Sequence, residues 1–242
     1  MNLLTGFLLI YAGAGVLAGL KFFRYSRWLL IMALIGHGCL LGAGALHCGH
    51  LPIFTLPETL SVSALLLGCL ALVFGWRYPG QSAVQPWALL LIVLLLGAAI
   101  LQPPPPACFD YNHSYTYAVA FHLFRRLALG LTLFASVLFF NALLQAGPAP
   151  HSAAQLRYQG RNAIMAAVLM YMLGEDVGII WCLQGWGDVW HWSPTFALST
   201  MVLVYLMLAL HLPGGSRRPG FSYSLVGLSC GPLMLLAQFF KS

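Results

Sequence analysis

Three histidines lie within or at the ends of long apolar stretches of this chain. His37 lies inside the second stretch, His122 opens the fifth and His211 ends the seventh. Imidazole is a common metal ligand and the usual axial ligand of haem iron. A histidine inside a membrane span is costly, and for that reason it is a functional candidate. We interpret all three as candidate iron ligands; the alternative for each is a hydrogen-bonded histidine of the protein core.

Four charged residues form a second constellation in the same stretches. Arg125 and Arg126 follow His122 by three and four residues, so on a helix they share its face. A guanidinium pairs well with carboxylates, including the propionates of haem. Glu175 and Asp176 lie at a similar depth in the next stretch, which favours mutual pairing of the four charges. The pattern therefore indicates either structural ion pairs alone or ion pairs that also hold a ligand.

Tryptophans gather in the segment 183–195, between the sixth and seventh stretches. Trp186, Trp190 and Trp192 lie there together with His191. Tryptophan is enriched at membrane interfaces, so an aromatic belt explains part of the pattern. A belt does not require glycines between the tryptophans, whereas glycine lets a backbone approach a flat ligand closely. The segment is therefore either an interfacial belt or a platform for a planar ligand.

Membrane-spanning helices must position these residues. The chain is 60% hydrophobic and 7% charged, with a mean hydropathy of +0.85, whereas soluble domains carry about 25% charged residues. Several apolar stretches reach about 18 residues, the length that a helix needs to cross a bilayer. Because these stretches are continuous, they predict helices rather than the alternating strands of a barrel. We predict an all-α, polytopic transmembrane bundle of about eight spans, at 3–20, 28–46, 59–76, 86–102, 118–144, 162–183, 195–212 and 221–240.

The charges between the spans orient this bundle. Loops on one side carry basic residues, and loops on the other side carry acidic residues with no Lys or Arg. The positive-inside rule then places both termini and the tryptophan-rich segment on the non-cytoplasmic side. The same asymmetry explains the net charge of +6, so no nucleic-acid partner is indicated. The basic residues are Lys21, Arg24, Arg27, Arg77, Arg157, Arg161, Arg217 and Arg218, and the acidic ones are Glu58, Asp110 and Asp188.

The loops are short and leave no room for a soluble domain, so we expect a single integral membrane domain over residues 1–242.

The six cysteines form no CxxC or CxxCH motif, which argues against a zinc knuckle and a covalent haem site. Cys48 and Cys108 both fall in outer segments, where an oxidising compartment would permit a disulfide. The alternative is that they are small apolar residues.

One motif resembles that of a known family. The stretch from Trp186 to Pro194 reads W-G-D-V-W-H-W-S-P. It is similar to the W-G-x-x-W-x-W-D-P signature of the tryptophan-rich "WWD" haem-handling proteins of cytochrome c assembly, of the CcsA, ResC and HemX type. The resemblance covers most of residues 28–240, and its most specific part is the tryptophan motif. Further matching residues are Gly49 to Pro52, Glu58, Gly178, Trp181 and the stretch from Tyr205 to His211.

The resemblance implies haem b at the outer face, beneath the tryptophan-rich segment, with axial histidines from the flanking helices. It implies that His122 is an outer ligand and His211 an inner one, with His37 as the partner of an inner haem. By position, the tryptophans and His191 belong to the outer haem site. Arg125 and Arg126 are not part of the family pattern.

Two departures from the family pattern concern the outer site. Ser193 stands where the family has Asp, and no G-L-H segment follows Gly231 to supply a second outer histidine. An outer haem would then take its sixth ligand from His191 or His113, or keep an open position. A haem held by a new ligand and two arginines could be permanent rather than transient.

Three functions remain open from the sequence. The first is a membrane protein that binds, translocates or presents haem for cytochrome c assembly, without being an enzyme by itself. The second is a b-type haem subunit that passes electrons within a membrane respiratory complex, which the missing Asp and the missing final histidine favour. The third is a haem-free structural or regulatory subunit.

Expected partners are haem, other membrane subunits of such a complex and an apocytochrome c. The expected location is a bacterial or organellar inner membrane, with the tryptophan-rich segment on the periplasmic side.

Overall fold

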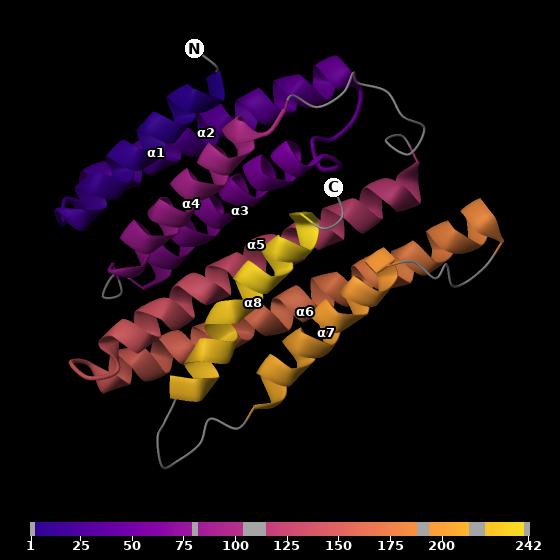
Figure 1. The fold of residues 1–242 in the computed structure, drawn as a ribbon. Coiled ribbons are helices and arrows are strands. Elements are labelled where there is room, and N and C mark those ends of the chain that lie inside the picture. Colours follow the sequence, from indigo (N-terminus) through magenta and orange to yellow (C-terminus); the bar gives the residue numbers. More distant parts are fainter. Residues whose placement is uncertain (1–2, 79–81, 104–114, 188–193, 213–220, 240–242) are drawn as a thin grey trace. The chain divides into compact units, whose positions relative to one another are not determined.

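The computed structural model describes residues 3–78, 82–103, 115–187, 194–212 and 221–239. The side chains of Trp186 and of residues 194–196 lie outside the described part as well. Every regular element among the described residues is an α-helix (Figure 1). The helices are α1 Leu3–Gly19, α2 Phe23–Cys48, α3 Leu56–Arg77, α4 Val84–Leu101, α5 Thr116–Gln145, α6 Pro150–Trp186, α7 Pro194–His211 and α8 Phe221–Phe239.

Each predicted span corresponds to one helix, so the prediction of an all-α bundle is confirmed for the described residues. Six helices, α2 to α6 and α8, are long and apolar enough to cross a membrane. The apolar parts of α1 and α7 are shorter, at Leu3–Gly19 and Ala197–His211. The chain therefore has the helices of a membrane-spanning protein.

Helix α6 begins at Pro150, well before the predicted start of its span at residue 162. Proline is favoured at the first position of a helix because its missing N–H needs no partner there. The first turns are polar but still have a packing stripe, since Ala153, Leu156 and Gly160 are buried. Arg157 and Arg161 therefore lie on α6 and not in a loop. With 37 residues, α6 is about 55 Å long, more than a bilayer core requires.

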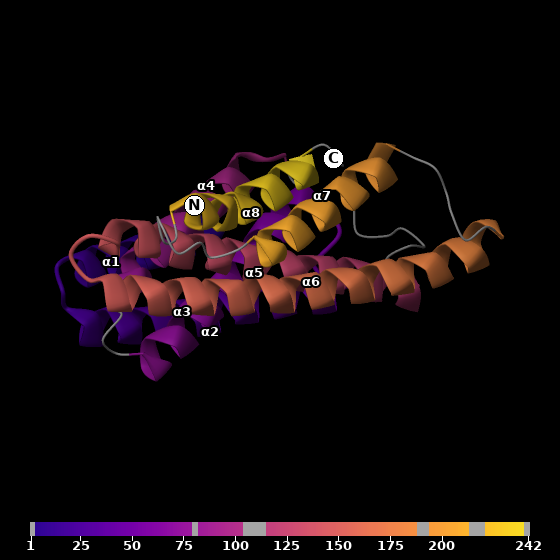
Figure 2. The same ribbon diagram turned by 90° about the horizontal axis from the view of Figure 1, so that it is seen from below.

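Contacts divide the chain into two compact units, Met1–His113 (unit 1) and Ser114–Ser242 (unit 2). In unit 1, α1 packs on α2 and α4, and α3 packs on α4 and α2. In unit 2, α5 packs on α6 and α8, and α7 packs on α8 and α6 (Figures 1 and 2). The expectation of a single integral membrane domain stays a prediction.

Glycines allow α6 and α8 to approach α5 closely. A Cβ at Gly227 would lie 2.4 Å from the ring of Phe139, and one at Gly160 would lie 2.8 Å from it. Phe139 is fully buried between these two glycines. A Cβ at Gly231 would lie 2.6 Å from Ser136 Oγ and 3.0 Å from α5 backbone atoms. Small residues drive helix association in lipid because they let neighbouring helices pack closely.

The approach of α8 to α5 gives a first prediction. Gly231→Ala should lower the free energy of unfolding by about 1–3 kcal/mol, because the added methyl group meets α5 backbone that cannot move aside. The measurement is equilibrium unfolding in mixed detergent micelles. Gly44→Ala on α2 is the matched control, since nothing lies within 4 Å of its Cβ position. Equal effects of the two substitutions would contradict the packing described for α8.

Candidate functional site

The site is built where α5 and α6 run side by side in opposite directions. Tyr115 donates a hydrogen bond to Gln184, and Arg125 pairs with Glu175. These two contacts show that α5 and α6 are antiparallel. Gly178 lies between the two contacts and Gly174 lies next to Glu175, and a Cβ at either position would meet α5 side chains. Their spacing of four residues places both glycines on the face toward α5.

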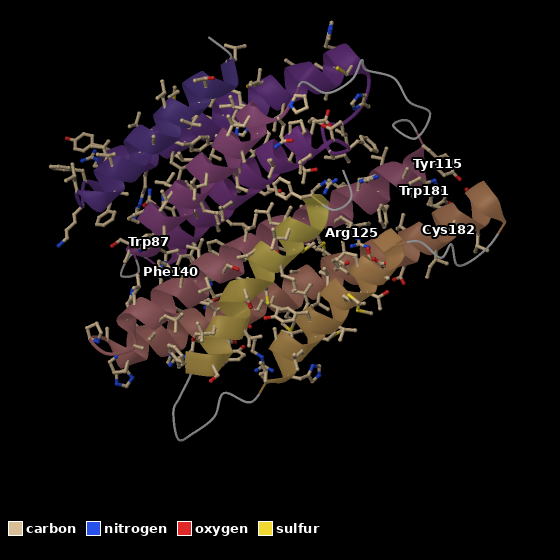
Figure 3. The ribbon with its side chains drawn as sticks, viewed as in Figure 1. Trp87, Tyr115, Arg125, Phe140, Trp181 and Cys182 are labelled. Carbon is tan, nitrogen blue, oxygen red and sulfur yellow. The ribbon has the colours of Figure 1, made fainter. Side chains whose placement is uncertain are left out.

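Three rings meet near the Thr116 end of α5, and we call Phe121, His122 and Trp181 the ring cluster. The ring centroids of Phe121 and Trp181 lie 5.8 Å apart, and those of His122 and Trp181 lie 6.4 Å apart. His122 is half-buried. Figure 3 shows Trp181 on α6 near the end where Tyr115 lies, with Arg125 farther along α5. The structure thus brings the predicted ligand His122 against Trp181, which matches the family pattern just before the motif.

Arg125 is one of two adjacent buried arginines on α5, with 4% of its surface exposed. Its Nη2 forms an ion pair with Glu175 Oε1. The guanidinium carbon lies 3.8 Å from the centroid of the Tyr171 ring and 5.0 Å from that of Phe121. Cation–π contacts are strongest where the cation is removed from water. Tyr171 donates its hydroxyl to the Ser199 carbonyl at 2.7 Å, which links the cation to α7.

The other three predicted charges behave differently from one another. Arg126 is 5% exposed, and its Nη1 donates to Gln238 Oε1 of α8 at 2.5 Å. Glu175 is the partner of Arg125. Asp176 lies on the exposed side of α6. Adjacent residues on a helix point about 100° apart, so Glu175 and Asp176 cannot both face α5.

Two residues of this network, Tyr171 and Gln238, were missed by sequence reasoning. The sequence contains a feature that predicts each of them. Tyr171 precedes Glu175 by four residues and so shares its helix face. Gln238 is a polar residue near the end of an apolar helix, which requires a partner in lipid.

A narrow crevice lies beside Arg125, where α5, α6, α7 and α8 meet. It has no room for a water molecule, so a cofactor does not fit in it without movement of the helices. Nε of Arg125 is buried and has no hydrogen-bond partner among the described residues. The crevice is lined by Arg125, Tyr171, Ser199, Val202, Met234, Ala237 and Gln238.

His37 lies in unit 1 as a fully buried core residue. Its Nδ1 is 3.3 Å from the Tyr11 hydroxyl and its Nε2 is 2.8 Å from Ser61 Oγ. Phe7 stacks on the imidazole at 5.9 Å between ring centroids. Both ring nitrogens are therefore occupied, which fits a hydrogen-bonded core histidine better than an iron ligand.

His211 lies at the end of α7 in unit 2 and is exposed. Its Nδ1 is 2.8 Å from the Met207 carbonyl oxygen. Because a carbonyl oxygen can only accept, Nδ1 carries the proton, and the Nε2 lone pair of the neutral imidazole points elsewhere. This arrangement is common for a metal-binding histidine, whose other nitrogen is fixed by a backbone carbonyl.

Several predicted residues lie outside the described part of the chain. They are Trp190, His191, Trp192, Ser193, Cys108, His113 and the side chain of Trp186. Cys48 is disulfide-bonded, whereas Cys39, Cys69, Cys182 and Cys230 form no disulfide. Within the described ranges, no group of three or more His, Cys, Asp or Glu side chains is arranged to hold a metal ion.

A scan against protein-family models finds no match to the chain, and a search of curated proteins finds no significant relative. The resemblance to the haem-handling family therefore rests on the residues of the motif alone.

The ion pair gives a second prediction. Glu175→Gln should lower the free energy of unfolding by about 3 kcal/mol, because it leaves the Arg125 guanidinium buried without a counter-charge. Equilibrium unfolding in micelles measures the change. The control is Asp176→Asn, which removes the same charge from the adjacent exposed position and should cost less than about 0.5 kcal/mol. The double variant Arg125→Met and Glu175→Leu should recover most of the lost stability, since it buries no charge. If Glu175→Gln were no more destabilising than Asp176→Asn, the ion pair would not stabilise unit 2.

Proposed function

We propose that this protein binds haem b in the membrane and presents or translocates it for cytochrome c assembly. The observation that carries the proposal is the ring cluster, in which His122 lies against Trp181, a residue that matches the family pattern just before the motif. The tryptophan-rich segment follows Trp181 within a few residues along the chain. A histidine next to flat apolar rings is the donor set that haem iron and a porphyrin face require.

The described residues fit this group at His122 better than at His37. His122 is half-buried near the Thr116 end of α5, whereas His37 is fully buried with both ring nitrogens in hydrogen bonds. In the proposal, His122 would bind the iron through the lone pair of a ring nitrogen, and Trp181 would pack against the imidazole. Bound haem would supply a redox-active iron. Trp186, Trp190, Trp192 and His191 complete the site by their position in the motif.

The membrane orientation is part of the proposal. The basic residues near the first, third, fifth and seventh connections would face the cytoplasm, and both termini and the tryptophan-rich segment would face the periplasm of an inner membrane. His211, at the other end of α7, would then lie on the cytoplasmic side as an inner ligand. An apocytochrome c and other membrane subunits are the partners that this function needs.

A second candidate function is a b-type haem subunit of a respiratory complex. The buried Arg125–Glu175 pair, one turn from His122, favours it, because a fixed polar core is suited to a haem that stays in place. A haem-free structural subunit is the third. The hydrogen bonds of His37 and the ion pair of Arg125 would then serve only to join helices.

The haem proposal predicts a reducible Soret band in the purified wild-type protein. His122→Ala should remove most of the bound haem, because it deletes the iron ligand, and it should abolish cytochrome c maturation. His151→Ala is the control, since His151 is an exposed residue at the start of α6. Substoichiometric haem supports the assembly function, and stoichiometric haem with copurifying redox partners supports the electron-transfer function. An unchanged spectrum in His122→Ala would contradict the site.

The orientation is tested with the substitutions His47→Cys and His151→Cys, made one at a time. In the background protein, the cysteines outside the disulfide (Cys39, Cys69, Cys182 and Cys230) are replaced by serine. Both positions are exposed, His47 in the last turn of α2 and His151 in the first turn of α6. A membrane-impermeant thiol reagent applied to intact cells should label the cysteine at 47 and leave the one at 151 unlabelled until the cells are opened. The reverse pattern would contradict the proposed orientation.

A further inference from the structure

Phe121 contacts the other two rings of the ring cluster and also the Arg125 guanidinium of the ion pair. Its ring centroid lies 5.3 Å from that of His122 and 5.8 Å from that of Trp181. One helical turn along α5, the Arg125 guanidinium carbon lies 5.0 Å from the same centroid. Residues four apart on a helix share a face, so Phe121 and Arg125 are both directed toward α6. Phe121 therefore lies between the Arg125–Glu175 pair and His122.

A missing side chain on α6 leaves the space for the Phe121 ring. A Cβ at Gly178 would lie 3.0 and 3.2 Å from two carbons of that ring, which is too close unless the ring shifts. The neighbouring glycines are less restricted. A Cβ at Gly174 would make ordinary contacts of 3.5–3.7 Å, and one at Gly185 would have nothing within 4 Å.

We propose that Phe121 is the positioning residue of the His122 site and that Gly178 is required to let its ring lie there. The inference rests on the proposed haem function. Trp181 contacts both Phe121 and His122, so a displaced Phe121 ring moves Trp181 relative to the imidazole. Because the Arg125 guanidinium also packs against the Phe121 ring, the ion pair acts on His122 through Phe121 as well.

The test compares Gly178→Ala with Gly44→Ala in the full chain, reconstituted in lipid nanodiscs. Haem is titrated into haem-depleted protein, and the dissociation constant and the Soret position are measured. Gly178→Ala should weaken haem binding by about tenfold, as loss of the support around a metal ligand typically does, and should shift the Soret band. Gly44→Ala should change neither quantity, because nothing lies within 4 Å of its added methyl group.

A double-mutant cycle identifies the route of the effect. In a Phe121→Leu background, Gly178→Ala should cause no further loss of haem affinity, because the ring that the methyl group strikes is gone. If Gly178→Ala weakens binding equally in both backgrounds, its effect does not pass through Phe121 and the proposal is wrong.

A haem-independent measurement separates this inference from the proposed function. In protein labelled with ¹⁵N-histidine, the ring signals of His122 are identified by their loss in His122→Ala. They should shift in Gly178→Ala and stay in place in Gly44→Ala. If Gly178→Ala does not fold, Phe121→Leu alone should shift the same signals. Unshifted His122 signals overturn the positioning role, whereas wild-type protein that binds no haem overturns the proposed function alone.

Discussion

The pairing of a buried guanidinium decides the arrangement of unit 2. Arg125 is almost completely enclosed by apolar helices, and an unpaired charge there would cost several kcal/mol. Glu175 satisfies it only if α5 and α6 adopt one register along their length. The same register places Phe121 opposite Gly178 and brings Trp181 against His122. The geometry of the candidate haem site thus follows from an electrostatic requirement one helical turn away.

Both units satisfy polar side chains by joining helices, since lipid offers no hydrogen bonds. In unit 1, the His37 imidazole connects hydroxyls of α1 and α3. In unit 2, Arg126 reaches the Gln238 amide of α8, and Tyr171 reaches the backbone of α7. The two units differ in how far their histidines are buried. His37 of unit 1 is fully buried, whereas the ring cluster of unit 2 lies near a helix end and His122 is half-buried.

Sequence reasoning located the helices well but assigned partners less well. Apolar length is a property of the local sequence, so a helix was found for each predicted span. The starts of α2 and α6 were predicted too late; the polar first turns of α6 form helix because Ala153 and Leu156 still pack. The pairing of Arg125 with Glu175 was expected from matched depth. The Gln238 partner of Arg126 was not, because depth along a span does not fix which way a side chain points around the helix.

The sequence by itself determined an apolar helical bundle, the residues that break its apolarity and the tryptophan motif with its implied haem chemistry. Only the tertiary structure decided which of those polar residues meet. It placed His37 in a closed hydrogen-bonded cluster, His122 beside Trp181, and Asp176 on an exposed face one residue from the paired Glu175. The physical reason is that composition and spacing set how deep a residue lies in the membrane. Its rotation about the helix axis and the identity of the neighbouring helix depend on how glycines and bulky side chains pack.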